Sequence, residues 1–312
     1  MVHTCAKSPE PVVHPHPGPG HRAPERSDPS LVEVAPTGPW TIVLPVRVGP
    51  YAKSRLGVRP GLVSAMVADC LDAVAHCPAV ARMIVVRGPE DLAVPDRAEV
   101  VPEKVNGDPD RLNQALRAGI AGTDPPVAVL LADLPALTPR SLQAALISVS
   151  AAAHEQATPV LHVPDAEGTG TVLLASTDTS SLPLRFGPGS ARAHEKAGSR
   201  PVAALARIRR DVDTAADLMA AWLLGVGERT RTRLTPMQVS VLDFDPASGM
   251  GHVVTDDGLR LPLSQTALVG SGLRHLRPGQ RLSALLDTDD DGIQVVSAVR
   301  INGIGQPMAD QP

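Results

Sequence analysis

Short, continuously apolar runs alternate along this chain with segments of helical periodicity, and this alternation constrains the fold more than any other feature. The apolar runs are rich in β-branched side chains and occupy residues 40–46, 83–86, 127–131, 159–163 and 171–175. Apolar residues at helical spacing occupy residues 60–77, 110–120, 137–153 and 214–224. Strands that are apolar on both faces belong to sheets covered on both faces. The sequence therefore predicts an α/β fold, with a mostly parallel sheet and helices on both faces.

Composition supports a packed core and argues against two classes of protein. Hydrophobic residues make up 43% of the chain and aromatic residues only 2%, so the core is built mainly of small branched side chains. The net charge of −4 provides no general basic field for nucleic acid. No apolar run reaches the roughly 18 residues of a membrane span, and the first residues do not resemble a secretory signal. We expect a cytoplasmic protein without membrane contact.

The cysteines do not indicate a disulfide framework. The chain has three, Cys5, Cys70 and Cys77, and an odd number cannot be fully paired within one chain. Cys70 and Cys77 fall on one side of a predicted helix, which favours core packing over a metal or redox pair.

Changes in composition divide the chain into five segments. Residues 1–39 are rich in Pro, His and Gly and are predicted to be a disordered tail. The α/β domain is expected at 40–228, followed by a basic linker at 229–237. Residues 238–304 show short strands with Gly and Asp turns, which predicts a small all-β barrel of OB-like size. Residues 305–312 form a second tail.

Ligands of such sheets bind beyond the carboxyl ends of the strands, and the loop after the first strand carries three cations. Arg47, Lys53 and Arg55 fall there, shortly before a predicted helix start. Cations and free backbone N–H groups suit a triphosphate, although a solvated basic loop is the alternative. Neither a Walker A motif nor G-x-G-x-x-G is present.

Carboxylates follow a buried strand and precede the last predicted helix of the domain. Asp133 comes just after the run at 127–131, where it is well placed to hold a hard cation that bridges phosphates. Asp211 and Asp213 would point to the same side if extended. The alternatives are that Asp133 is an N-cap or a surface residue, and that Asp213 or Thr214 caps the helix. We predict a metal site of Asp133 with Asp211 or Asp213.

Two glycine- and hydroxyl-containing loops and one amide complete the candidate site. The loops are 168–171 (GTGT) and 186–190 (FGPGS), and they offer hydroxyls and backbone N–H groups to phosphate or carboxylate oxygens. Each is a weak signal alone, and the first could be a plain hairpin turn. The amide of Asn113 could read a nucleotide base edge, or it could simply be a polar helix position.

Residues 40–230 resemble the phosphoenolpyruvate and 2-phospho-L-lactate guanylyltransferases of coenzyme F420 biosynthesis. The segments that carry this resemblance occur in the family's order, and they are 42–46 (IVLPV), 52–56 (AKSRL), 133–137 (DLPAL), 168–171 (GTGT), 185–190 (RFGPGS), 211–214 (DVDT) and 224–227 (LGVG). The resemblance implies a nucleotide-diphospho-sugar-transferase-like fold. It also implies a reaction in which GTP and a three-carbon phospho-acid give a guanylylated product and pyrophosphate.

The same resemblance assigns roles to individual residues. It places the acceptor at Thr171, Gly187 and Ser190, and Mg²⁺ at Asp133 and the 211–213 motif. We expect Arg47, Lys53, Arg55 and Asp133 to be catalytic, the three cations to cover the triphosphate, and Asn113 to contact the nucleotide. Arg47 departs from the family, which usually has Lys there, and the two cations are not interchangeable. The acceptor phosphate is already ionised near pH 7, so the task is to align two anions rather than to supply a general base.

The segments 241–245 (VLDFD), 249–254 (GMGHVV), 256–258 (DDG) and 276–281 (LRPGQR) follow one another in the last part of the chain. With them, residues 239–301 resemble a cold-shock-type OB barrel, a module that binds single strands by stacking bases on aromatic side chains. Met250 and His252 stand where that family has aromatics, and only Phe244 remains. Nucleic-acid binding is therefore not expected, and a structural or protein-contact role is favoured.

Two other functions compete with this interpretation. One is a guanylyltransferase acting on a molybdenum-cofactor precursor, but the glycine-rich first loop of that enzyme type is absent. The other is a single-strand-binding module with a degenerate catalytic domain. The sequence does not choose between phosphoenolpyruvate and 2-phospho-L-lactate. It also leaves open a homo-oligomer or a contact with the next enzyme of the pathway.

Overall fold

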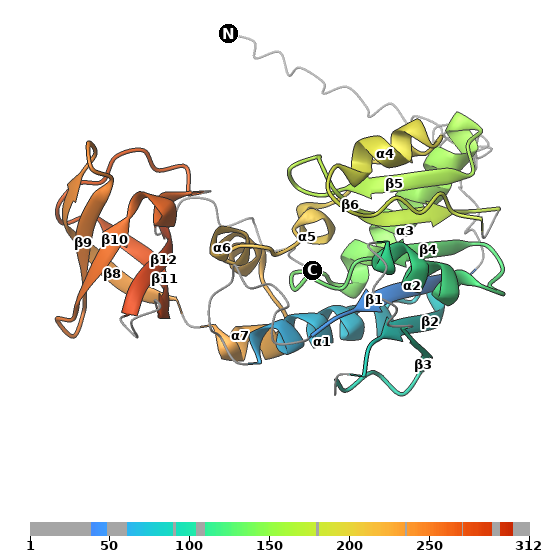
Figure 1. Ribbon diagram of the computed structural model, residues 1–312, viewed down its shortest axis with the longest axis horizontal. Helices are drawn as coiled ribbons and strands as arrows, with labels where there is room; N and C mark the ends of the chain where they lie inside the picture. Colours follow the sequence, from blue (N-terminus) through green and yellow to red (C-terminus); the bar gives the residue numbers. More distant parts are fainter. Residues whose placement is uncertain are drawn as a thin grey trace, which may run out of the picture. The chain divides into compact units, whose positions relative to one another are not determined.

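The computed structural model describes residues 39–48, 61–89, 92–103, 110–178, 181–234, 236–269, 271–288 and 294–301 (Figure 1). Its first part is a seven-stranded sheet in the order β3-β2-β1-β4-β6-β5-β7. The strands are β1 (Trp40–Val46), β2 (Val80–Arg87), β3 (Ala98–Pro102), β4 (Val127–Leu130), β5 (Val160–Pro164), β6 (Thr171–Ser176) and β7 (Arg200–Pro201). Strand β6 runs antiparallel to β4 and β5, and the other neighbours pair in parallel. The mostly parallel sheet is confirmed.

The reversal of β6 comes from a hairpin turn that joins it to β5. Asp165 N–H donates to the Gly170 carbonyl at 3.0 Å, which closes the turn. The 168–171 loop is thus part of a hairpin, as the simpler alternative predicted. Because β6 is reversed, its first residue, Thr171, lies at the sheet edge where β4 and β5 end.

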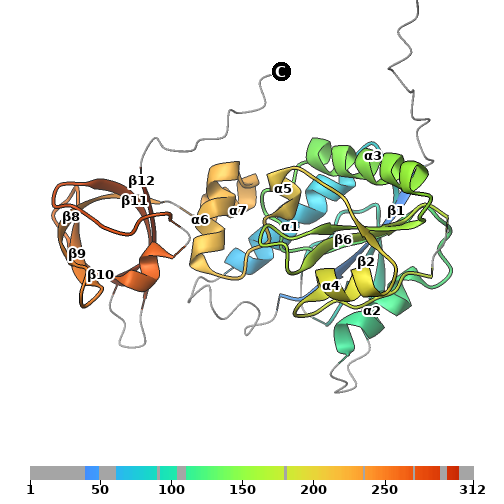
Figure 2. The same ribbon diagram turned by 90° about the horizontal axis from the view of Figure 1, so that it is seen from above.

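Helices cover both faces of the sheet. They are α1 (Leu62–Ala75), α2 (Arg111–Ile120), α3 (Pro139–Gln156), α4 (Ser190–Lys196), α5 (Ala206–Arg209), α6 (Ala215–Leu224) and α7 (Glu228–Arg233). Figure 2 shows α3 and α2 on opposite sides of the sheet. Alternate residues of β1 enter the two apolar clusters, since Ile42 and Leu44 pack toward α1 and α3 while Val43 packs toward α2. Two-sided burial explains why the strands are continuously apolar.

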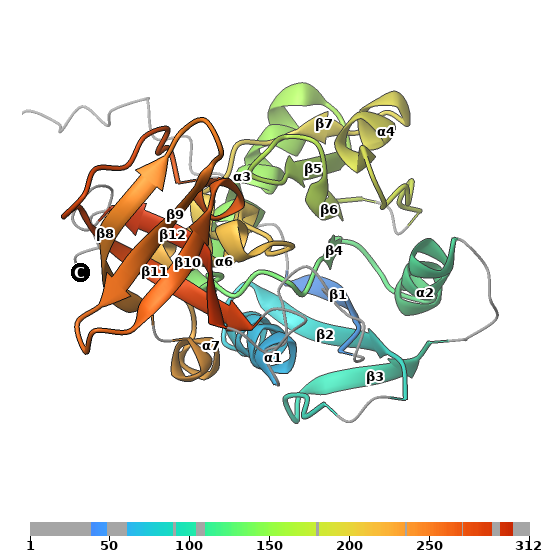
Figure 3. The ribbon, with the colours of Figure 1, turned by 60° about the vertical axis from the view of Figure 1, so that its left-hand side comes forward.

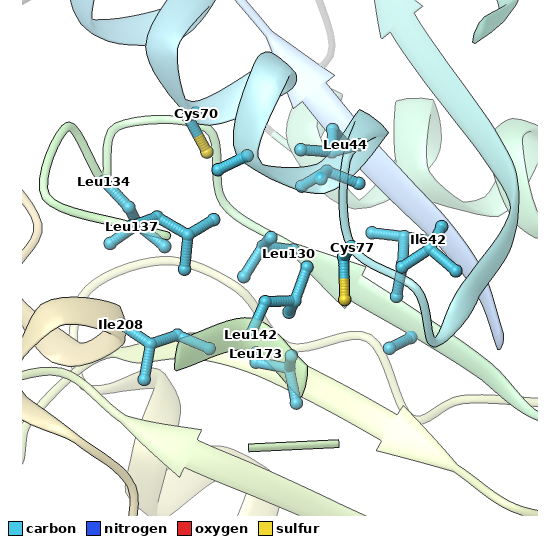
Figure 4. Packing of buried hydrophobic residues seen from close by; sticks show 14 of the residues in the cluster. Ile42, Leu44, Cys70, Cys77, Leu130, Leu134, Leu137, Leu142, Leu173 and Ile208 are labelled. Carbon is cyan, nitrogen blue, oxygen red and sulfur yellow. The ribbon is translucent and has the colours of Figure 1, made fainter. Parts of the chain in front are cut away.

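Both cysteines of α1 and its C-terminal loop are packing residues. Cys70 and Cys77 are free and buried, and they belong to the larger apolar cluster with Leu130 and Leu142 (Figure 4). Burial is the main cause that raises the pKa of the Cys70 thiol. The predicted packing role is confirmed.

Capping boxes set the starts of α3 and α6. Thr138 caps α3 with Pro139 at the first helical position, and Thr214 caps α6. The Thr214 hydroxyl accepts from the Asp217 N–H at 3.2 Å while the Asp217 carboxylate accepts from the Thr214 N–H at 3.0 Å. Thr214 is therefore the cap of this helix, and Asp213 is not.

The segment expected to be a linker contains helix α7, which the sequence did not predict. Asp69 of α1 is buried, and its carboxylate accepts from the backbone N–H groups of Arg229 at 3.1 Å and Thr230 at 2.7 Å. These bonds satisfy N–H groups that the start of a helix leaves free. A Cβ on Gly227 would lie 2.3 Å from the Asp69 carboxyl carbon, so this glycine lets the two segments approach.

The last part of the chain is a closed five-stranded barrel in the order β10-β12-β11-β8-β9 (Figure 3). Its elements are β8 (Met237–Asp245), β9 (Met250–Thr255), β10 (Arg260–Ser264), the 3₁₀ helix η2 (Gln265–Leu268), β11 (Arg281–Thr288) and β12 (Gln294–Ile301). An apolar cluster that includes Val239, Val253 and Leu282 fills it. The small all-β barrel is confirmed, and its resemblance to a cold-shock module stays a prediction.

Within the part of the chain that the structure describes, the helices are too short or too polar to cross a membrane.

Candidate active site at the sheet edge

The candidate site lies where β4 and β5 end and β6 begins. Asp133 follows β4, Asp165 follows β5 directly, and Thr171 is the first residue of β6. The Leu131 N–H donates to the Val172 carbonyl at 2.9 Å, which joins the end of β4 to the start of β6. Loops from three strands therefore meet at one edge, as the placement of ligands in such sheets requires.

Asp133 and the 211–213 segment, far apart in the sequence, are neighbours. The Val212 N–H donates to the Asp133 carbonyl at 3.2 Å. Val212 is fully buried, in one apolar cluster with Ala136 and with Leu218 of α6. Asp133 and Asp211 are half-buried, and Asp213 is exposed. The packing of Val212 thus brings the backbone of the second acidic segment to the first.

Asp211 also lies in an acidic group whose other members the sequence did not suggest. One carboxylate oxygen from each of Asp165, Glu167 and Asp211 lies within 4.8 Å of the others. Asp165 accepts from the N–H groups of Thr169 at 2.8 Å and Gly170 at 2.6 Å. Its position directly after a buried strand is the same signal that singled out Asp133.

Glu167 forms an ion pair with Arg210 at 2.6 Å, and Arg210 also pairs with Asp217 at 3.1 Å. This arginine offsets part of the negative charge of the acidic group and links it to the first turn of α6.

The first cation of the predicted phosphate loop is held by a buried carboxylate. Arg47 donates to Glu103 at 2.6 Å, and Arg111 donates to both oxygens of the same carboxylate at 2.8 and 2.9 Å. Burial alone would raise the pKa of Glu103, but the hydrogen bonds and the positive charges of Arg47 and Arg111 together outweigh burial and lower it. Two arginines and one carboxylate leave a net positive charge, and 45% of the Arg47 side chain is exposed. Lys53 and Arg55 lie outside the described residues.

The three residues predicted to hold the acceptor come together. The Thr171 N–H donates to the Ser190 hydroxyl oxygen at 2.9 Å, and the Ser190 N–H donates to the Gly187 carbonyl at 3.1 Å. Thr171 and Ser190 are 2% and 3% exposed, whereas Gly187 is exposed. The 168–171 and 186–190 loops thus form one unit.

Asn113 is engaged inside the protein, and its role as a nucleotide contact stays a prediction. Its side-chain carbonyl accepts from the Phe186 N–H at 2.9 Å, and its amide nitrogen donates to the Phe186 carbonyl at 3.1 Å and to Asp110 at 2.6 Å. Both donor hydrogens are used, and the side chain is buried. Asn113 thus connects α2 to the 186–190 loop.

His194 of α4 is fully buried beneath these loops and has a partner on each ring nitrogen. Its Nδ1 lies 2.9 Å from the Thr171 hydroxyl, and its Nε2 accepts from the Arg185 N–H at 3.1 Å. Burial, with the charges of His162 and Arg185, lowers the pKa of His194 to about 4. The sequence analysis gave this histidine no role.

A protein-family model described as "Guanylyl transferase CofC like" matches residues 40–255 of this chain. The match covers the α/β part and ends inside the barrel, at the last residue of β9.

Three curated relatives carry the same name. A phosphoenolpyruvate guanylyltransferase of Streptomyces scabiei is 43% identical over 209 residues, which cover 61% of this chain and 94% of that protein. The enzyme of the same name from Salinispora arenicola is 43% identical over 203 residues, covering 61% and 91%. That of Streptomyces coelicolor is 40% identical over 208 residues, covering 61% and 93%.

Among solved structures, the chain is similar to a putative nucleotide-diphospho-sugar transferase from Desulfovibrio desulfuricans. The two are 18% identical with a TM-score of 0.41, and the match covers 58% of this chain and 85% of the other. Likeness at this level does not bear on function.

Proposed function

The chain belongs to the guanylyl transferase CofC-like family, and on that premise we propose that it transfers GMP from GTP to phosphoenolpyruvate and releases pyrophosphate in coenzyme F420 biosynthesis. The identity of about 40% to relatives named for this activity carries the proposal. The acceptor is phosphoenolpyruvate rather than 2-phospho-L-lactate because each of these relatives is named for the former. We place the reaction in the cytoplasm, a reducing compartment in which cysteine thiols stay unpaired, because Cys70 and Cys77 are both free.

The donor atoms at the sheet edge fit a hard divalent cation such as Mg²⁺. The candidates are carboxylates, the oxygen ligands that Mg²⁺ prefers, and three of them approach within 4.8 Å. Asp133 and an aspartate of the 211–213 segment would hold the ion, with Asp165 and Glu167 beside Asp211 as further candidates. When bound, the ion would supply positive charge to the phosphates of GTP.

The work of the protein itself is to bring two anions together. Arg47 offers positive charge after β1 while Glu103 holds its guanidinium in place. Lys53 and Arg55 would extend that charge over the triphosphate. No protein base is required, because the acceptor phosphate is already ionised near neutral pH. The enzyme must therefore lower the barrier by aligning the two anions and neutralising their charge.

The acceptor would bind against the unit formed by Thr171, Gly187 and Ser190. The Ser190 oxygen accepts from Thr171, which leaves the serine hydrogen to donate to an anion. Gly187 is exposed and has a positive φ of 137°, a conformation in which a backbone without Cβ can approach a ligand closely.

The test is pyrophosphate release from GTP by the purified chain, with phosphoenolpyruvate, with 2-phospho-L-lactate and with no acceptor. Release is expected with phosphoenolpyruvate and not without an acceptor. Asp133→Asn should lower turnover by at least about 100-fold, as loss of a charge that holds a metal does.

Asp124→Asn is the matched control, because Asp124 is exposed and precedes β4 whereas Asp133 follows it. The control should keep wild-type turnover. Near-wild-type turnover of Asp133→Asn would refute the metal role. Equal release with and without acceptor would refute the transfer reaction.

A further inference from the structure

The hydrogen bonds of His194 define which of its ring nitrogens carries the proton. Nε2 accepts a hydrogen bond from the Arg185 backbone N–H at 3.1 Å, so Nε2 has no hydrogen of its own. A neutral imidazole then carries its proton on Nδ1. The Nδ1–H donates to the Thr171 hydroxyl oxygen at 2.9 Å. The ring is neutral near pH 7, because burial and neighbouring charges lower the pKa of His194 to about 4.

The loop that sets this tautomer is itself held on two sides. Asn113 binds both the N–H and the carbonyl of Phe186, the residue after Arg185. The Phe186 ring meets the imidazole edge-on, with ring centroids 5.0 Å apart at 71°. The Arg185 N–H is therefore fixed in direction, and the imidazole has little freedom to flip.

The direction of the Thr171 hydroxyl follows from the tautomer of His194. A hydroxyl that accepts from Nδ1–H must aim its own hydrogen elsewhere. The Thr171 backbone is held by its bond to Ser190, so the hydroxyl oxygen can leave the ring only by rotation of the side chain about χ1, which would break its bond to His194. The opposite tautomer would draw the threonine hydrogen to Nδ1 and turn oxygen lone pairs outward, which an anion would avoid.

We propose that His194 is a positioning residue that fixes the Thr171 hydroxyl as a hydrogen-bond donor to an anionic oxygen of the acceptor. This inference rests on the proposed function, in which Thr171 contacts the acceptor. The proposal adds the buried His194 to a site whose other members lie on loops. Asn113 then has an indirect role, because it holds Phe186 and thereby the neighbouring Arg185 N–H that bonds to His194.

Two substitutions separate the functions of the two ring nitrogens. In His194→Asn, the amide nitrogen takes the place of Nδ1 and can still donate to Thr171. In His194→Gln, the amide oxygen takes the place of Nε2 and can still accept from Arg185, but the donor to Thr171 is lost. We expect His194→Gln to raise the KM for the acceptor roughly tenfold, the effect of losing one hydrogen bond to a charged group. The KM for GTP should not change, and His194→Asn should stay within about threefold of wild type.

A double-mutant cycle shows whether His194 acts through Thr171. Thr171→Val removes the hydroxyl at similar volume and should raise the acceptor KM by about the same factor as His194→Gln. Adding His194→Gln to Thr171→Val should then change nothing more. Fully additive effects would overturn the proposal, as would a His194→Gln protein whose kcat falls while the acceptor KM is unchanged. A His194→Asn protein with the full KM increase of Thr171→Val would overturn it as well.

The tautomer of His194 can also be measured on the wild-type chain, so this test does not depend on whether a variant folds. Nitrogen-15 NMR of the histidine rings reports the tautomer, and the expected result for His194 is a proton on Nδ1. A proton on Nε2 would overturn the proposal. Failure of the proposed function has a different signature, since the wild-type protein would then release no pyrophosphate with phosphoenolpyruvate, whatever the tautomer.

Discussion

Acidification should destabilise the α/β domain through His194, by an amount that follows from its burial. Desolvation, with the charges of His162 and Arg185, lowers the pKa of His194 from 6.5 to about 4. In the unfolded chain the ring takes up a proton as the pH falls below about 6.5, while in the folded chain it does so only near pH 4. The contribution of this group to stability is therefore complete above pH 6.5 and is lost between pH 6.5 and 4. A pKa difference of this size corresponds to about 3 kcal/mol.

Urea unfolding, followed by tryptophan fluorescence, measures this contribution. The two tryptophans of the chain are Trp40 in β1 and Trp222 in α6. Trp40 reports the core of the sheet, and Trp222 reports the cluster in which α6 packs with Leu285 and Ala298 of the barrel. Wild type and His194→Gln should be compared at steps from pH 7 to pH 4. Carboxylates titrate in both proteins, so their effects largely cancel in the difference between the two free energies of unfolding. His162 is coupled to His194 by charge, so the difference reports the two histidines together.

The wild type should lose about 3 kcal/mol relative to His194→Gln over this range. A difference that stays constant within about 1 kcal/mol would show that His194 binds its proton equally well in the folded and unfolded chain. The hydrogen bond from the Arg185 N–H to Nε2 would then be wrong, because a protonated ring has no acceptor there.

Two glycine substitutions test the close approaches of the fold. Gly170→Ala would place a Cβ 2.3 Å from the Asp165 Oδ2 that accepts the Gly170 N–H; we expect the turn before Thr171 to shift and turnover with the acceptor to fall roughly tenfold. A Gly170→Ala enzyme of wild-type turnover would contradict the expectation. Gly227→Ala would place a Cβ 2.3 Å from the Asp69 carboxyl carbon and should cost about 1–3 kcal/mol of stability in urea, by disturbing the cap of α7. An unchanged urea midpoint would show that Asp69 has room to move.

The sequence predicted elements well where burial alone decides them. The run at 40–46 is β1 from Trp40 to Val46, because a strand buried on both faces is apolar along nearly its whole length, and Thr41 is its one polar residue. Strand β3 was missed because Ala98–Pro102 is short, largely exposed in the edge strand of the sheet, and interrupted by Glu99, so its apolar residues form no continuous run. Helix α7 was missed because its sequence, ERTRTR, has no apolar periodicity. Its start is stabilised by Asp69, about 160 residues earlier in the chain.

The site shows the same division between local and distant causes. A carboxylate after a buried strand can be found from the strand itself, and this signal located Asp133. The hydrogen-bond partner of a polar side chain depends on the fold. For Asn113, the sequence showed which hydrogen bonds its amide can make but not which residue it bonds to. Phe186, which uses that capacity, is 73 positions away. The Glu103 that holds Arg47 is 56 positions from it.

A motif residue can therefore be required without touching a substrate, and the two loops here show why. Gly170 is needed where the Asp165 carboxylate approaches its Cα, and Asp165 in turn holds the N–H groups of Thr169 and Gly170. The remaining polar residues of the two loops at the acceptor site are Thr171 and Ser190, and each hydroxyl has one hydrogen and two lone pairs. Each uses its oxygen to accept a bond from within the protein, from His194 and from the Thr171 N–H respectively. Each consequently keeps its hydrogen for a ligand, so this pair can present two donors to an anion while its oxygens remain satisfied inside the protein.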